Sequence, residues 1–257
     1  MGAKSRCLAF TVLLVSLLLA TASLCRQLWR RTPTVVLVPA LFRHKIEDRP
    51  WMLEYDTAVY QKLSPDAPNY IPNKAHEAAF YFKYLVDSYD RLPDVVLFTQ
   101  DDTGQDTVDR LKCLRTGADW GWTPLNQPQA YFKDRVLKQY WGEELMWKCW
   151  YRLAADFGVE LPEQPVVSLY CCSEFAVTRS RVRQYSHQAY KDAYGTLMLS
   201  DECNAGSHLG RGAWAVEHLH HHLFGNMPLQ MDALNNTEWC KRYMAGCHES
   251  NCLPEPA

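Results

Sequence analysis

The sequence has no excess of charge of either sign, and it lacks the short motifs of several common sites. Its 27 Lys and Arg against 29 Asp and Glu leave a net charge of −2, so there is no general electrostatic reason to bind DNA, RNA or an anionic membrane surface. No Cys-x-x-Cys pair, nucleophile-elbow sequence or Gly-rich phosphate loop is present, which disfavours zinc, serine-hydrolase and P-loop chemistry. What remains is a globular composition, 47% hydrophobic, that is long enough to bury a sizeable core.

The amino-terminal segment is the longest stretch without charge. Residues 7–25 are 19 uncharged, mostly apolar residues, preceded by Lys4 and Arg6. Small residues at 20–22 offer a signal-peptidase site, while the length also fits a membrane anchor, and both alternatives stay open. We therefore predict that residues 1–31 are a signal peptide or signal anchor with a short basic stalk. The rest of the chain would lie in the ER or Golgi lumen, as a type II membrane protein, or be secreted.

The cysteines beyond this segment agree with an oxidising compartment. They are even in number and lie at positions 113, 149, 171, 172, 203, 240, 247 and 252. Such a set in a secretory protein predicts disulfides, and we expect Cys240, Cys247 and Cys252 to tie down a tail over residues 229–257. Asn235 begins an Asn-Asn-Thr sequon and is a predicted glycosylation site.

Two uninterrupted apolar runs define the predicted fold. Residues 35–38 and 95–98 read as strands buried on both faces and, with a long helix between them, as parallel neighbours in one sheet. That helix follows Pro72, with Asn73 as its N-cap. Further strands are expected at 57–60, 166–170 and 175–177, and further helices within 129–158, from about 180, and over 212–224. The sequence thus predicts one α/β domain over residues 32–228, with a mostly parallel central sheet flanked by helices. The Trp residues 141, 147 and 150 are expected to pack in its core.

Polar residues at a strand end and at a helix start are the first candidate site. Gln100, Asp101 and Asp102 follow the second apolar run, where open α/β sheets bind ligands. The two aspartates could hold Mn²⁺ or Mg²⁺, and the alternative is a solvated turn. Asn73, His76 and Glu77 stand at the start of the long helix, where free N–H groups favour an anion such as a diphosphate; helix-capping electrostatics is the alternative.

Glu217 is the candidate catalytic residue. In the helix predicted over 212–224 it lies on a stripe with Trp214, His221 and Phe224, which predicts partial burial. Burial raises the pKa of a carboxyl group, and a raised pKa suits a general base near neutral pH. His221, four residues on, could instead be a structural partner. The four histidines of this helix lack the His-Glu-x-x-His order of a zinc site and are more typical of core or surface positions.

The same segments resemble a family of unknown function. The matching sequences, spread over roughly residues 34–226, are Tyr60-Gln61-Lys62, Pro72-Asn73-Lys74-Ala75-His76-Glu77-Ala78, Leu92-Pro93-Asp94 through Gln100, Phe175-Ala176-Val177, and Glu217 through Gly225. The family reads Tyr-Asn-Lys, Pro-Asn-Val-Gly-Arg-Glu-Ala-His, Leu-Pro-Asp-x-x-x-Phe-x-Gln-Gly, Phe-x-Val-Ser-Arg and Leu-Glu-Arg-x-Trp-x-x-x-Phe-Gly at these places.

This order of motifs is similar to several glycosyltransferase families of the GT-A type. The resemblance implies a GT-A-like domain that transfers a sugar from a nucleotide-sugar donor to a glycan or protein acceptor. Glu217 would be the acceptor base or would orient the acceptor hydroxyl, and the donor site would be lined by Asn73, His76, Glu77, Gln100, Asp101 and Asp102. The chain departs from the motifs at four positions: Ala75 and His76 replace Gly and Arg, Asp101 replaces Gly, and His218 replaces Arg. Because two arginines that could clamp a phosphate are missing, the alternative is a non-catalytic glycan- or protein-binding protein of the same fold.

Overall fold

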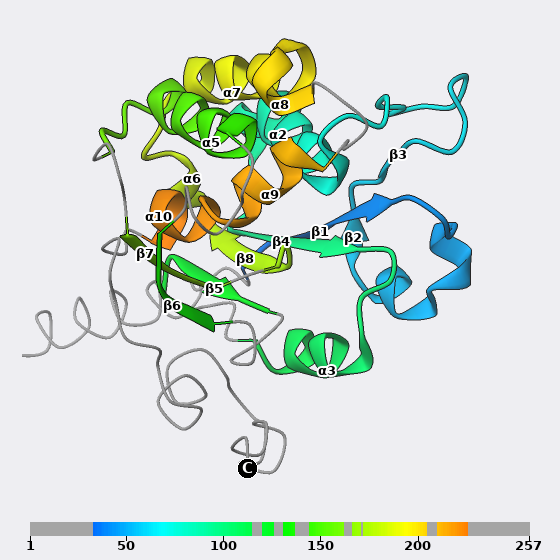
Figure 1. The fold of residues 1–257 in the computed structure, drawn as a ribbon. Helices are drawn as coiled ribbons and strands as arrows, with labels where there is room; N and C mark the ends of the chain where they lie inside the picture. The colour runs from blue at the N-terminus through cyan, green and yellow to red at the C-terminus, as the bar shows by residue number, and fades with distance from the viewer. Residues whose placement is uncertain are drawn as a thin grey trace, which may run out of the picture. The chain divides into compact units, whose positions relative to one another are not determined.

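Residues 33–114, 120–125, 131–136, 144–161, 166–170, 172–204 and 210–225 are described in the computed structural model (Figure 1). Their elements belong to one compact unit that begins at Thr34. No helix among these residues is long and apolar enough to span a membrane. The targeting segment at 7–25, the sequon at Asn235 and the three tail cysteines lie outside the described residues, and their assignments stay predictions.

The central sheet is built on the two apolar runs. β1 (Val35–Leu41) and β4 (Val95–Gln100) pair in parallel from Val35↔Val95 to Ala40↔Gln100, which confirms the predicted neighbours. β2 (Asp56–Thr57) and β3 (Tyr60–Gln61) add to β1, also in parallel. On the other side of β4, β8 (Phe175–Thr178) and then β5 (Trp122–Pro124) pair antiparallel. The sheet is therefore mixed, in the order β2-β1-β4-β8-β5.

Helices cover the two faces of this sheet (Figure 1). α2 (His76–Ser88), α5 (Glu144–Asp156), α7 (His187–Leu199) and α9 (Arg211–Glu217) share one core cluster with the side chains of Val38, Val96 and Val177. On the opposite face, α3 (Gln105–Cys113) contributes to a second cluster with Leu37, Leu97 and Ala176. The alternation follows from the strand period, since successive side chains point to opposite faces.

The chain changes face between β1 and β4. After β1 it reaches α2 on the first face, whereas after β4 it enters α3 on the second. In open α/β sheets, ligands bind outside the carboxyl ends of strands at such a switch point. The fold therefore directs attention to the segments that directly follow Leu41 and Gln100.

The remaining elements are short or lie apart from this sheet. They are the 3₁₀ turns η1 (Ile46–Asp48), η2 (Pro50–Glu54) and η3 (Tyr89–Arg91), the helices α6 (Arg179–Val182), α8 (Asp201–Asn204) and α10 (His220–Gly225), and the antiparallel pair β6 (Tyr131–Val136) and β7 (Val166–Tyr170). A disulfide between Cys149 and Cys203 links α5 to α8 across 54 residues, which in the chain-entropy view contributes about 4 kcal/mol. Cys113 and Cys172 are half-cystines as well.

Three local predictions are wrong. The segment 129–158 holds strand β6 before helix α5, although Trp150 is fully buried in the core as expected. α2 begins at His76, and its N-cap is Ala75 in the left-handed region (φ 54°), so Asn73 lies before the helix and does not cap it. The helix predicted over 212–224 is broken into α9 and α10.

Candidate functional site

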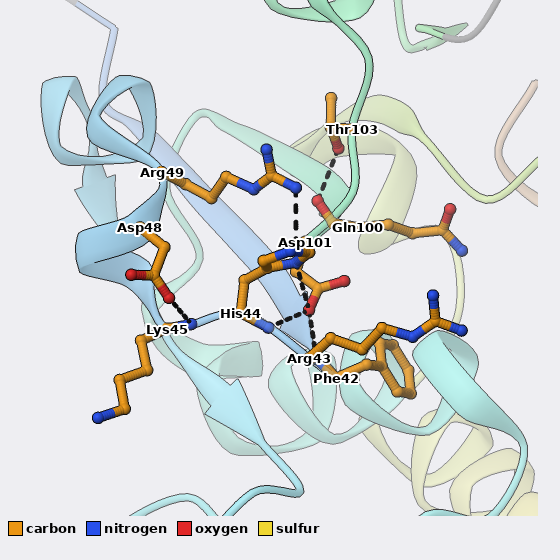
Figure 2. Close-up of polar contacts among 9 residues, drawn as sticks. All are labelled: Phe42, Arg43, His44, Lys45, Asp48, Arg49, Gln100, Asp101 and Thr103. Atoms are coloured by element: carbon orange, nitrogen blue, oxygen red, sulfur yellow. Dashed lines mark hydrogen bonds and ion pairs between the residues drawn. The ribbon is translucent and has the colours of Figure 1, made fainter.

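Asp101 organises the loop that follows β1. Its Oδ2 accepts the backbone N–H groups of Phe42, Arg43 and His44 at 2.9, 2.6 and 2.9 Å (Figure 2). Burial alone would raise the pKa of this carboxyl group, but the three N–H donors and nearby His44 lower it overall. Three successive N–H groups around one oxygen form a concave anion site, and here the chain fills that site itself. Asp101, only 3% exposed, thus fixes the carboxyl ends of β1 and β4 to each other.

This geometry bears on the expected metal ligands. Oδ2 of Asp101 already accepts three hydrogen bonds from the loop, and the neighbouring Asp102 is exposed. No group of three or more His, Cys, Asp or Glu that could hold a metal ion occurs among the described residues. The residues present do not by themselves make up a Mn²⁺ or Mg²⁺ site, so we assign no chemical step to a metal.

Two side chains at this edge are free to meet a ligand. Arg43 is exposed and Gln100 partly so, and Figure 2 shows both extending to the same side of Asp101, whereas Lys45 leads off on the other side. Within the described part of the chain, the Arg43 guanidinium forms no ion pair. An Arg on a fixed backbone is well suited to bind a phosphate or carboxylate.

Three consecutive residues before β8 connect the predicted site segments. The backbone N–H of Cys172 donates to Glu217 Oε1 at 2.8 Å, and the Ser173 hydroxyl donates to Glu77 Oε1. Glu174 accepts from the hydroxyls of Thr103 and Thr107 and from the backbone N–H of Gln100. Residues 172–174 therefore touch the end of α9, the first turn of α2 and the end of β4, and bring Glu217, Glu77 and Gln100 around one short segment.

Glu217 has the pKa that its sequence setting predicts. Its pKa is raised from the ordinary 4.5 to about 7: burial raises it most, the Cys172 N–H partly opposes this, and the neighbouring carboxylate of Glu77 adds a smaller increase. A carboxyl group with this pKa exchanges its proton near neutral pH, as a general base must. The chemistry available here is proton transfer by Glu217, beside a second carboxylate and a serine hydroxyl.

The residues of this site lie within the match to a known protein family. The model of a protein family of unknown function, DUF3431, matches residues 39–118 and 122–247. The chain belongs to the DUF3431 family. No curated protein and no solved structure matches it.

His218 and His220 of this DUF3431 chain are buried in its core. His220 stacks on Phe175, with ring centroids 4.4 Å apart, and its Nε2 lies 3.2 Å from the carbonyl oxygen of Cys172. Burial lowers the pKa of His220 to about 3 and that of His218 to about 4. Both rings are neutral at physiological pH, and His220 holds the carbonyl of the residue whose N–H faces Glu217.

The remaining predicted donor residues lie at the start of α2. The Oδ1 atom of Asn73 is buried and has no hydrogen-bond partner among the described residues. His76 has φ 43°, and its ring lies 5.8 Å from that of Phe42. Among the hydrogen bonds and ion pairs of the described residues, none joins Asn73 or Asp102 to Glu217.

Ser173, Glu174 and Arg43 are not indicated as site residues by any pattern in the sequence. Glu174 is 2% exposed. Burial raises its pKa, although the three hydrogen-bond donors around it act in the opposite direction. The sequence does place a Ser-Glu pair directly before an apolar strand. This pair indicates site residues only when β8 is known to run antiparallel to β4. In that direction the amino end of β8 meets the carboxyl end of β4.

Proposed function

We propose that this protein transfers a sugar from a nucleotide-sugar donor to an acceptor hydroxyl, with Glu217 as the general base. The observation that carries the proposal is the Glu217 carboxyl group, with a pKa of about 7, tied through residues 172–174 to the carboxyl edge of β1 and β4. Open α/β sheets place ligands at that edge, and a base near neutrality is what an attacking hydroxyl requires.

In the proposed reaction, Glu217 acts on the acceptor and the diphosphate of the donor is the leaving group. Glu217 removes the acceptor proton as the hydroxyl oxygen forms its bond to the anomeric carbon. The bond from that carbon to the diphosphate oxygen breaks, and the diphosphate leaves with the electron pair. Glu77, held by Ser173, keeps negative charge close to Glu217 and so maintains its affinity for the proton.

Arg43 is the cation that we assign to the donor diphosphate. The family motifs have Arg where this chain has His76 and His218, and burial keeps His218 neutral. Arg43 lies instead on the loop that Asp101 fixes, beside Gln100 and Asp102 at the strand ends. A guanidinium there can donate two hydrogen bonds to phosphate oxygens and balance the charge that develops on the leaving group.

The missing arginines favour one rival, a non-catalytic protein of the same family that binds a glycan or a protein partner. Under either reading we place the domain in the secretory pathway, in the ER or Golgi lumen on a membrane anchor, or secreted. The disulfide between Cys149 and Cys203 supports this, because such bonds persist in oxidising compartments.

Calorimetric titration with nucleoside diphosphates separates the two functions without an acceptor. We would titrate the full-length protein with UDP, GDP, ADP and CDP, each with and without Mn²⁺. The proposal predicts that at least one binds, and that Arg43→Gln weakens it about 10-fold or more, the scale of a charge-assisted hydrogen bond.

Lys45→Gln is the matched control, because it removes an equal charge two residues away on a side chain that points elsewhere (Figure 2), and it should leave binding unchanged. If Mn²⁺ is required, the predicted metal role of Asp101 and Asp102 regains support. Binding of none of the nucleotides, or equal binding by Arg43→Gln, would contradict the proposal.

A further inference from the structure

Trp214 is the one large side chain of α9 that faces solvent. It is 48% exposed, whereas Ala213, Ala215 and Val216 around it are buried. Glu217, three residues later, is the other residue of the helix that is not fully buried. Residues three apart lie on the same side of a helix, so the indole and the candidate base share one face of α9.

His76 borders the same surface from α2. A Cβ atom built on Gly210 would lie 3.5 Å from Trp214 Nε1 and 3.6 Å from two ring atoms of His76. Gly210 has φ −86°, which any residue adopts, so the backbone does not require glycine there. A methyl group at this position would fill the gap between the two rings, in ordinary van der Waals contact with both.

Polar groups continue this surface beyond His76. The His76 ring contacts Phe42, and the Lys62 ammonium lies 4.7 Å from the centroid of the Phe42 ring. An aromatic face edged by an imidazole, an ammonium and a carboxyl group suits a ligand that has both an apolar face and a hydroxylated edge. Pyranose rings have this character, because their axial C–H bonds carry partial positive charge toward an aromatic face while their hydroxyls exchange hydrogen bonds at the rim.

We propose that Trp214, with His76 across Gly210, is an acceptor platform on which a pyranose ring of a glycan stacks. This inference rests on the proposed function, which requires an acceptor hydroxyl near Glu217. It names that acceptor as a carbohydrate rather than a protein side chain. It also assigns Gly210 a role, which is to leave room between the rings.

Saturation-transfer NMR on the full-length protein, without nucleotide, tests the platform. The probes are the methyl glycosides of β-glucose, β-galactose, β-xylose, α-mannose and β-N-acetylglucosamine. We expect at least one to bind, with saturation strongest on the axial protons of one ring face. Trp214→Ala should weaken binding about 10-fold or more, whereas Trp214→Phe, which keeps an aromatic face, should lose about 3-fold.

Two further variants guard against indirect effects. Gly210→Ala meets only ordinary contacts, so it should leave the melting temperature unchanged and yet weaken glycoside binding. Leu53→Ala removes another exposed apolar side chain and should change nothing. Absence of glycoside binding, or binding that Trp214→Ala leaves intact, would overturn the inference. The nucleotide titration is independent of this result, so glycoside binding at Trp214 without nucleotide binding would refute the transferase and keep the platform.

Discussion

Replacing Glu217 by Gln should stabilise the folded protein above neutral pH. The wild-type carboxylate is partly buried near Glu77, so its charge is costly in the folded state. Gln has the same shape without the charge, and its side-chain oxygen can still accept the Cys172 N–H. A residue that only supported the fold would show the opposite effect.

The magnitude follows from the pKa shift. The folded pKa is about 7 against an ordinary value of 4.5, which at about 1.4 kcal/mol per unit amounts to about 3 kcal/mol. Since Glu217 is not fully buried, solvent screening reduces this to about 1–3 kcal/mol. Between pH 4.5 and about 7 the folded chain holds a proton that the unfolded chain has released. Wild-type stability therefore falls as the pH rises through this window.

Urea unfolding with the disulfides intact, at about pH 4, 6 and 8, measures the effect. The advantage of Glu217→Gln should be near zero at the lowest pH, grow through the window and level off above pH 7. Asp102→Asn, which removes an exposed carboxylate at the nearby strand end, is the control and should show no such growth. A variant that is less stable than wild type at pH 8 would contradict this prediction, because the carboxylate would then be stabilising the fold.

Three other predictions test the frame around the site. Asp101→Asn should cost about 1–3 kcal/mol in urea unfolding, because an amide replaces the charged acceptor of three N–H groups; an unchanged midpoint would contradict the role of Asp101. Gly212→Ala should cost about 1–3 kcal/mol by overpacking, since its Cβ would lie 2.5 Å from that of Ala75. In an Ala75→Gly background Gly212→Ala should cost less than in wild type, because only the Leu197 side chain then lies close to the new Cβ; an equal cost in both backgrounds would refute the contact. The proposed lumenal or secreted location predicts that the protein changes gel mobility on reduction and loses a glycan in Asn235→Gln; a protease-protection assay that exposes the domain to cytosol would contradict it.

The sheet was predictable where the sequence is unambiguous. Val35–Val38 and Val95–Phe98 are short, Val-rich and apolar without interruption, which favours strands buried on both faces. The break between α9 and α10 was not predictable from the apolar spacing, which continues through it. α9 ends where the backbone N–H of Leu219 bonds to the carbonyl of Val216, three residues back, instead of continuing the α-helical pattern. The His218 ring Nδ1 also bonds to the carbonyl of Trp214, which already accepts the His218 backbone N–H. Such local competition for backbone carbonyls is not visible in the apolar periodicity.

The candidate site was predictable in part for a similar reason. Glu77 and Glu217 stand out in the sequence because each is a carboxylate within an apolar helix pattern. Ser173 and Glu174 precede a short strand and look like loop residues. Their importance depends on β8 pairing antiparallel with β4, and strand order is a long-range property that local composition does not determine. Arg43 likewise gains its position only because Asp101, nearly 60 residues away, fixes its backbone.

Turnover of nucleotide sugars is the direct test of whether this protein is a glycosyltransferase with Glu217 as its base. The full-length protein would be incubated with UDP-glucose, UDP-galactose, UDP-N-acetylglucosamine and GDP-mannose, with a mixture of methyl glycosides as acceptors, and release of UDP or GDP followed across pH. The account predicts release with at least one donor, a rate that rises as the pH passes through about 7, and a rate about 10²–10⁴-fold lower in Glu217→Gln with nucleotide binding unchanged. Release from none of these donors, or equal release by Glu217→Gln, would contradict it.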